Sequence, residues 1–262
     1  LRQLEVDYLD MFFMHGINNP KYLTKEYVDM GERFRKQKKS KFFGFSCHGG
    51  NVVDLMNKAA ALGGIDCIMF RYNFSQYGDR ALNLAIDACK KAKIGLIAMK
   101  TQKSVPADQE EVQGFESKNF TLAQAKLKAV WADERIDSAV SHMDNMQKLK
   151  ENIAAAKSPI KIGMHEFKQL NRLAACTASY SCQGCSHLCE SKVQGETRVA
   201  DALRFLMYHE CYDEQDKARQ LWNELSPQER RIDDVDFAAA AAACPEGIDI
   251  AGRLRHAQAL LG

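Results

Sequence analysis

The chain has 262 residues, enough for one large domain or for one domain with a small satellite. Apolar residues make up 46% and charged residues 27%, as in an ordinary folded protein, and the net charge of +2 is too small to indicate a nucleic acid or an anionic membrane surface as partner. No apolar run approaches the roughly 18 residues of a membrane-spanning helix. We therefore expect a cytoplasmic protein, although a targeting segment upstream of Leu1 stays open.

The stretch from Val6 to Gly16 is a short apolar run, rich in aromatic residues, that ends in His15-Gly16. Such a run predicts a strand buried on both faces, as in a parallel sheet. The active sites of α/β barrels form where buried parallel strands end and present polar side chains. His15 is therefore a candidate site residue, although a histidine that merely satisfies a strand end has the same pattern.

After this stretch the chain repeats a strand followed by a helix four more times. The expected strands cover residues 6–16, 41–46, 65–73, 94–99 and 136–141, and the expected helices begin at Thr24, Asn51, Asp79, Thr121 and Asn145. Strands that alternate with helices at about 30 residues per unit predict a parallel sheet. The polar segment 101–120 is longer than a simple connection and is predicted to be functional.

The number of units decides between an open sheet and a barrel. No G-x-G-x-x-G follows any strand, which disfavours an open dinucleotide-binding sheet. A (β/α)8 barrel needs eight units, so five units indicate that three, on the order of 100 residues, are missing upstream. The sequence thus predicts an α/β fold, with a partial TIM barrel over residues 1–160 and a small, mostly helical module over residues 161–262. Unpaired strand edges would make this chain poorly soluble by itself.

The C-terminal module carries cysteines at the spacing C-x2-C-x3-C, with a fourth cysteine far along the chain. These residues are Cys182, Cys185, Cys189 and Cys244, the last followed by Pro245. Four thiolates close a tetrahedral zinc site or hold an iron–sulfur cluster. A Cys-Pro as the last ligand is typical of ferredoxin-type motifs and favours a 4Fe–4S cluster, with structural zinc and plain thiols as the alternatives. Spare ligands are His187 and Cys176.

Several short motifs follow one another in a characteristic order. They are Asp7-Tyr8-Leu9-Asp10, Met14-His15-Gly16, Gly44-Phe45-Ser46, Arg71-Tyr72-Asn73, the segment 125–131 and Glu151-Asn152-Ile153. Together they resemble the aldo/keto reductases, in the branch with a C-terminal 4Fe–4S extension. The resemblance implies a TIM barrel that this chain enters at its fourth strand, with NADP(H) or NAD(H) over the C-terminal face. It also implies reduction of a small carbonyl substrate by hydride transfer.

By position in the motifs, His15 matches the catalytic histidine of the family, which orients the carbonyl and shares in proton transfer. The Tyr, Asp and Lys of that family belong to earlier strands. We therefore expect the chain itself to be inactive, as the C-terminal portion of an active oxidoreductase. An electron-transfer partner for the cluster is also possible under this resemblance.

The resemblance also assigns cofactor-binding positions, which are Ser46, His48, Asn73, Lys100, Glu151 and Asn152. Three departures from the family pattern accompany them. Cys47 replaces the usual Asn, so His48 is expected to supply that polar contact. Arg71 replaces the commoner Gln, and residues 142–145 replace a Gly-led turn. Together with Ser141, the strand-end residues are expected to converge on one rim of the barrel.

A second class of function remains open. Under this second hypothesis the barrel has no catalytic activity. The protein is a scaffold stabilised by a bound metal, or an electron-transfer module, with structural zinc in place of iron and sulfur. Under this hypothesis Lys100, Glu151 and Asn152 are ordinary surface residues.

Overall fold

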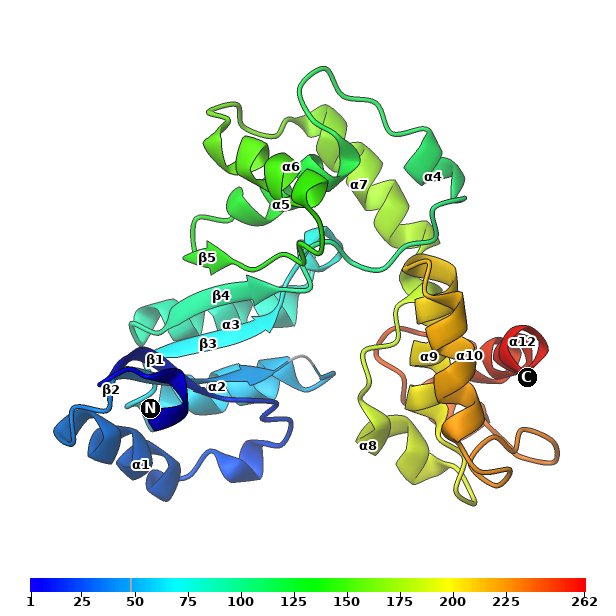
Figure 1. Ribbon diagram of the computed structural model, residues 1–262, viewed down its shortest axis with the longest axis horizontal. Helices are drawn as coiled ribbons and strands as arrows, with labels where there is room; N and C mark the ends of the chain where they lie inside the picture. The colour runs from blue at the N-terminus through cyan, green and yellow to red at the C-terminus, as the bar shows by residue number, and fades with distance from the viewer. Residues whose placement is uncertain (48) are drawn as a thin grey trace. The chain divides into compact units, whose positions relative to one another are not determined.

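The computed structural model describes residues 1–47 and 49–262, so His48 lies outside the described residues. The chain forms two compact units (Figure 1). The first comprises residues 1–102 and 116–170, and the second comprises residues 103–115 and 171–262. The sequence predicts a single boundary at residue 160, whereas the observed division assigns part of the long polar segment to the second unit. No helix in the described part of the chain is long and apolar enough to cross a membrane.

The first unit is built from alternating strands and helices. Its strands are β1 (Leu9–Met14), β2 (Ser40–Cys47), β3 (Cys67–Arg71), β4 (Gly95–Met99) and β5 (Ser138–Ala139). Its helices are α1 (Lys25–Lys36), α2 (Val52–Leu62), α3 (Arg80–Lys91), α5 (Leu122–Trp131) and α6 (Met146–Lys157), with 3-10 turns η1 (Arg2–Leu4), η2 (Pro20–Tyr22) and η3 (Phe74–Gln76). All strand pairs are parallel, in the order β1-β2-β3-β4-β5 (Figure 1). The predicted α/β fold with a parallel sheet is confirmed.

Polar side chains set where the helices begin. Thr24, Asp79, Thr121 and Asn145 each accept a hydrogen bond from a backbone N–H in the first turn of the helix that follows, as the sequence predicts. Asn51 is an exception. It occupies the cap position of α2, but its side-chain amide donates to the carbonyl oxygen of Asn18 at 2.6 Å.

One face of the sheet packs against helices to form the core of the first unit. The strand residues on this face are Phe12, Phe43, Phe45, Ile68, Phe70, Leu96 and Ala98. They meet buried residues of α2 and α3, and Phe43 also packs against the rings of Tyr27 and Phe34 in α1. Burying these side chains removes apolar surface from water, which is the main stabilising contribution to the unit.

The opposite face of the sheet is apolar but less covered. Its side chains include Met11, Phe13, Phe42, Met69, Ile97 and Met99, all of them partly or largely exposed. Phe42 has 42% of its surface exposed. Parallel sheets normally have both faces covered, because both faces carry apolar side chains. The strand sequences therefore suit a sheet that is buried on this side too.

Gly44 lies in β2 at a position where the neighbouring strand leaves no room for a side chain. A Cβ atom at this position would lie 2.0 Å from the carbonyl oxygen of Cys67 in β3. We expect Gly44→Ala to destabilise the first unit by about 2 kcal/mol, because the strand backbone must shift. Thermal unfolding of the two proteins measures the effect. Gly78→Ala is the matched control, since a Cβ there meets no atom within 4 Å; equal losses in both variants would contradict the prediction.

The second unit is helical. Its helices are α4 (Glu110–Gln113), the C-terminal part of α7 (Met164–Cys176), α8 (Ser186–Cys189), α9 (Val199–Cys211), α10 (Gln215–Glu224), α11 (Ala238–Ala242) and α12 (Ile250–Leu261), with 3-10 turns η4 (Ala178–Tyr180) and η5 (Glu190–Lys192). Helices α9 and α10 lie side by side (Figure 1). Leu206, Trp222 and Leu254 come from three different helices and share one core.

Candidate functional site

The candidate site residues of the first four strands lie where those strands end. His15 follows β1, Ser46 lies in the last residues of β2, and Lys100 follows β4. Asn73 is two residues beyond β3, and Ser141 is two residues beyond β5. Because neighbouring strands are parallel and follow chain order, their C-terminal ends share one edge of the sheet. This edge is the rim referred to below.

Ser46 joins the ends of the first two strands. Its Oγ lies 3.1 Å from Nδ1 of His15, and the backbone N–H of Gly16 donates to the same oxygen at 3.1 Å. The backbone carbonyl of Ser46 accepts a further hydrogen bond from Ile17 at 2.9 Å. Ser46 itself is buried, whereas His15 is exposed. Ser46 therefore binds the backbone that follows His15 and also meets the ring of this exposed residue.

Asn73 joins the ends of the third and fourth strands. Its side-chain amide donates to the carbonyl oxygen of Lys100 at 3.0 Å. Its side-chain oxygen accepts from the backbone N–H and the hydroxyl of Ser75 in η3, for which Asn73 is the N-cap. Lys100 has a positive φ of 58° and an exposed side chain. Asn73 is buried, and these hydrogen bonds join the ends of two neighbouring strands.

Glu151 and Asn152 lie on α6, which follows β5. The hydroxyl of Thr121 donates to Oε1 of Glu151, and the side-chain amide of Gln124 donates to its backbone oxygen at 3.3 Å. The side-chain nitrogen of Asn152 and the hydroxyl of Ser141 are buried without a hydrogen-bond partner among the described residues. Buried polar groups are nearly always paired, so these two groups are exceptions to the general rule.

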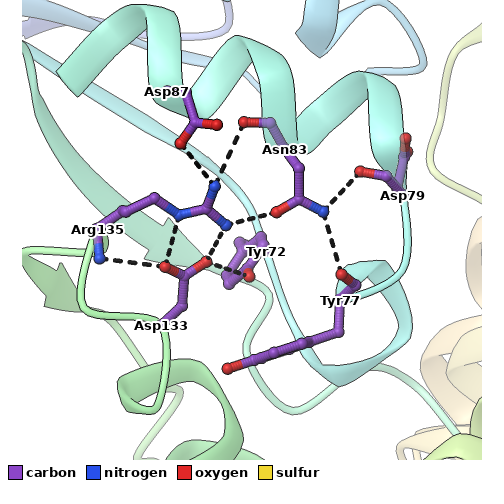
Figure 2. A network of polar contacts seen from close by, with 7 residues as sticks. All are labelled: Tyr72, Tyr77, Asp79, Asn83, Asp87, Asp133 and Arg135. Atoms are coloured by element: carbon purple, nitrogen blue, oxygen red, sulfur yellow. Dashed lines mark hydrogen bonds and ion pairs between the residues drawn. The ribbon is translucent and has the colours of Figure 1, made fainter. Parts of the chain in front are cut away.

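A network of polar side chains begins at Tyr72, directly after β3, and was not predicted from the sequence (Figure 2). The buried Tyr72 hydroxyl donates to Oδ2 of Asp133 at 2.7 Å, and the Arg135 guanidinium binds both oxygens of that carboxylate at 2.8 Å. The same guanidinium reaches Asp87 at 2.8 Å and the side chain of Asn83. Burial favours the neutral acid, but hydrogen bonds from Arg135 and Tyr72 hold the pKa of Asp133 below its ordinary value.

This network connects the residue before Asn73 to α3 and to the loop between α5 and β5. Tyr72 is adjacent to Asn73, so the network fixes the backbone from which Asn73 projects. The signal in the sequence is the acid–base pair of Asp133 and Arg135 directly after α5. Acid–base pairs at this spacing are usually exposed on the surface, so the sequence alone does not distinguish this pair from an ordinary surface ion pair.

The four clustered cysteines all lie in the second unit, and no disulfide joins any of the nine cysteines. Burial raises the pKa of the Cys182 thiol to about 12, and the charges of three neighbouring thiols add to the shift. These neighbours are Cys185, Cys189 and Cys244. No group of three or more His, Cys, Asp or Glu side chains in the described part of the chain is arranged to hold a metal ion. Four cysteines are the right kind and number of ligands for a metal bound by thiolates. Their side chains, as the structure describes them, are not arranged around a common metal position.

Part of the long polar segment belongs to the second unit because its contacts are there. The Ser181 hydroxyl donates to the backbone oxygen of Ser104 at 2.9 Å, and the Ser104 hydroxyl lies 2.5 Å from that of Tyr212. Farther along, the side-chain amide of Gln109 donates to the Tyr180 hydroxyl at 3.4 Å. The segment that follows Lys100 is therefore held by residues adjoining the cysteine cluster.

Comparison with known proteins finds similarity at the level of structure. No family model and no curated protein matches the sequence. The holo form of aldo-keto reductase AKR11C1 from Bacillus halodurans is similar, with a TM-score of 0.53 at 16% identity, over 66% of this chain and 61% of that chain. An aldo-keto reductase from Klebsiella pneumoniae in complex with NADPH has a TM-score of 0.50 at 20% identity, with the same coverages. The chain thus spans about three fifths of these structures and shares their fold over that part.

Proposed function

We propose that the first unit is the C-terminal part of an NAD(P)H-dependent reductase of the aldo/keto reductase type, which acts on a small carbonyl compound. The observation that carries the proposal is the rim. Polar residues lie at the ends of successive parallel strands. The side chains of His15 and Ser46 are within hydrogen-bond distance, and the side-chain amide of Asn73 donates to the backbone oxygen of Lys100. The shared fold with a protein solved in complex with NADPH supports the cofactor.

The chemistry follows from what these residues offer. A reduced nicotinamide would supply the hydride, which adds to the carbonyl carbon while a proton reaches the carbonyl oxygen, so that an alcohol and an oxidised cofactor result. His15 orients the carbonyl oxygen through its exposed ring and takes part in moving the proton. Ser46, Asn73 and Lys100 would lie near the nicotinamide and phosphate portions, because they stand at the ends of β2, β3 and β4. His48, which the resemblance assigns to the cofactor as well, lies outside the described residues.

Glu151 and Asn152 are proposed to hold the adenosine portion. Support comes from the buried side-chain nitrogen of Asn152, a hydrogen-bond donor without a partner among the described residues. The position of Glu151 is already fixed, because Thr121 and Gln124 bind it. A ligand that accepts from Asn152 would therefore meet a preorganised helix face, which lowers the entropic cost of binding.

We further propose that additional strand–helix units complete the barrel. The partly exposed apolar face of the sheet, with Phe42 and Ile97, suits burial inside a closed barrel. The Tyr, Asp and Lys of the family would lie on those units, so this chain by itself binds the cofactor without reducing a carbonyl.

Titration with NADPH tests the proposal on the chain as it is. We expect the fluorescence of the reduced nicotinamide to change on binding, and Asn152→Ala to weaken binding about threefold to tenfold through the loss of one hydrogen bond. Lys150→Ala is the matched control, because Lys150 is an exposed residue of the same helix. Absence of NADPH and NADH binding by the unaltered protein would defeat the reductase proposal and favour a silent scaffold.

For the second unit we propose that Cys182, Cys185, Cys189 and Cys244 bind a 4Fe–4S cluster. Their spacing in the sequence, with Pro245 after the last of them, supports this assignment. Structural zinc is the alternative with the same ligands. Hydride transfer needs no iron, so the cluster would either carry electrons to a partner or stabilise the second unit.

A further inference from the structure

We propose that Ser46 fixes the tautomer of His15, so that the neutral ring carries its proton on Nε2 and presents it at the rim as a hydrogen-bond donor. Two contacts carry the inference. The Ser46 hydroxyl oxygen lies 3.1 Å from Nδ1 of His15 and accepts the backbone N–H of Gly16, also at 3.1 Å. Ser46 is only 4% exposed, whereas His15 is exposed, so one nitrogen of the ring is bound inside and the other is accessible.

The direction of the proton between Ser46 and His15 follows from counting donors and acceptors. A serine hydroxyl has one proton and two lone pairs, and the N–H of Gly16 uses one lone pair. If Nδ1 of His15 donated to the other lone pair, the buried hydroxyl would need another acceptor, and an unpaired buried donor is costly. Among the described residues, Nδ1 of His15 is the acceptor that this hydroxyl meets. The hydroxyl therefore donates to Nδ1, which leaves the ring proton on Nε2.

The consequence for catalysis rests on the proposed reductase function. A carbonyl oxygen is an acceptor, so it pairs with Nε2–H and is repelled by the lone pair of the other tautomer. Ser46 acts on the substrate only through His15, which makes it a positioning residue. It thereby gains a role in addition to the cofactor contact that its motif implies.

Nitrogen NMR of the histidine rings tests the proposal without cofactor. In protein labelled with ¹⁵N at histidine, Nδ1 and Nε2 have distinct shifts in each tautomer, and His15→Gln identifies the His15 signals by their disappearance. We expect neutral His15 to be protonated at Nε2 in the unaltered protein. A ring protonated at Nδ1 would overturn the proposal whatever the variants do.

Variants of Ser46 and Ser40 distinguish the effect of the Ser46 hydroxyl on the His15 tautomer from a general effect of the substitution on the fold. Ser46→Ala should give a mixture of the two tautomers, and Ser46→Thr should restore the single one, because threonine keeps the hydroxyl. Ser40→Ala is the control, since Ser40 is a buried serine at the other end of β2 whose hydroxyl bonds to the backbone oxygen of Phe42. An unchanged tautomer in Ser46→Ala would overturn the proposal. NADPH titration of the unaltered protein tests the proposed function separately, so the two failures are distinguishable.

Discussion

Arg135→Ala should destabilise the first unit by about 3 kcal/mol, because it leaves Asp133 buried without its cation. In the intact protein the guanidinium binds both oxygens of that carboxylate and also reaches Asp87 and Asn83 (Figure 2). The Asp133 side chain is 6% exposed, so water cannot replace the lost partner. Urea unfolding followed by circular dichroism measures the change.

The pH dependence of this variant gives a second readout. In the intact protein the folded-state pKa of Asp133 is lowered, so its ionised form contributes stability above the unfolded value of about 3.9, and this contribution is lost as the pH falls through the folded pKa. Without Arg135, burial dominates and the folded pKa rises above the unfolded one. The variant should then lose less stability than the intact protein on going from neutral pH to about pH 4.

Lys25→Ala is the matched control for this network. Lys25 pairs with Asp29 at 2.7 Å, but its side chain is 79% exposed. Exposed pairs contribute little, so the unfolding midpoint should stay where it is. Equal effects of Arg135→Ala and Lys25→Ala would show that the Asp133 network is no more than a surface ion pair.

The alternation of strands and helices was predictable because it depends on local pattern. Apolar runs of strand length, and caps such as Thr24 and Asp79, lie next to the elements that they define. Interactions between distant residues were not predictable in this way. The pair of Ser104 and Tyr212 is separated by 108 positions, and nothing local distinguishes that serine from others in a polar segment. The assignment of residues 103–115 to the second unit depends on such pairs.

The candidate site was predictable in part for the same reason. Strand order and strand ends follow from the repeat, which brings His15, Ser46 and Asn73 to one rim. The hydrogen bonds of the rim depend on register and rotamer, which the sequence does not specify. In the second unit the residues from 197 to 222 have apolar side chains at helical spacing throughout, and they lie in two helices, α9 and α10, with Asp213 between them at a φ of 57°. A positive φ interrupts a helix without altering the apolar periodicity of the residues around it.

Cys185→Ser should abolish metal binding by the second unit and with it much of that unit's stability. Metal bound to thiolates contributes its binding free energy to folding, because the unfolded chain holds no formed site. Protein expressed with iron and sulfide should be brown, with a visible absorbance that bleaches on reduction, and colourless protein with one zinc would favour the structural alternative. Elemental analysis gives the metal content per chain, and limited proteolysis reports on the fold.

A second variant and a control test which cysteines bind the metal. Cys244→Ser should have the same effect as Cys185→Ser, although the two residues are far apart in sequence, because the last thiolate closes the site. Cys211→Ser should leave the metal content unchanged, since Cys211 lies at the end of α9 and outside the motif. Because the described side chains are not arranged as a metal site, binding must draw the four thiols closer together. Protease resistance should therefore increase when metal is added to the unaltered protein and not when it is added to Cys244→Ser. Equal metal content in all three variants would remove the four-cysteine site from consideration.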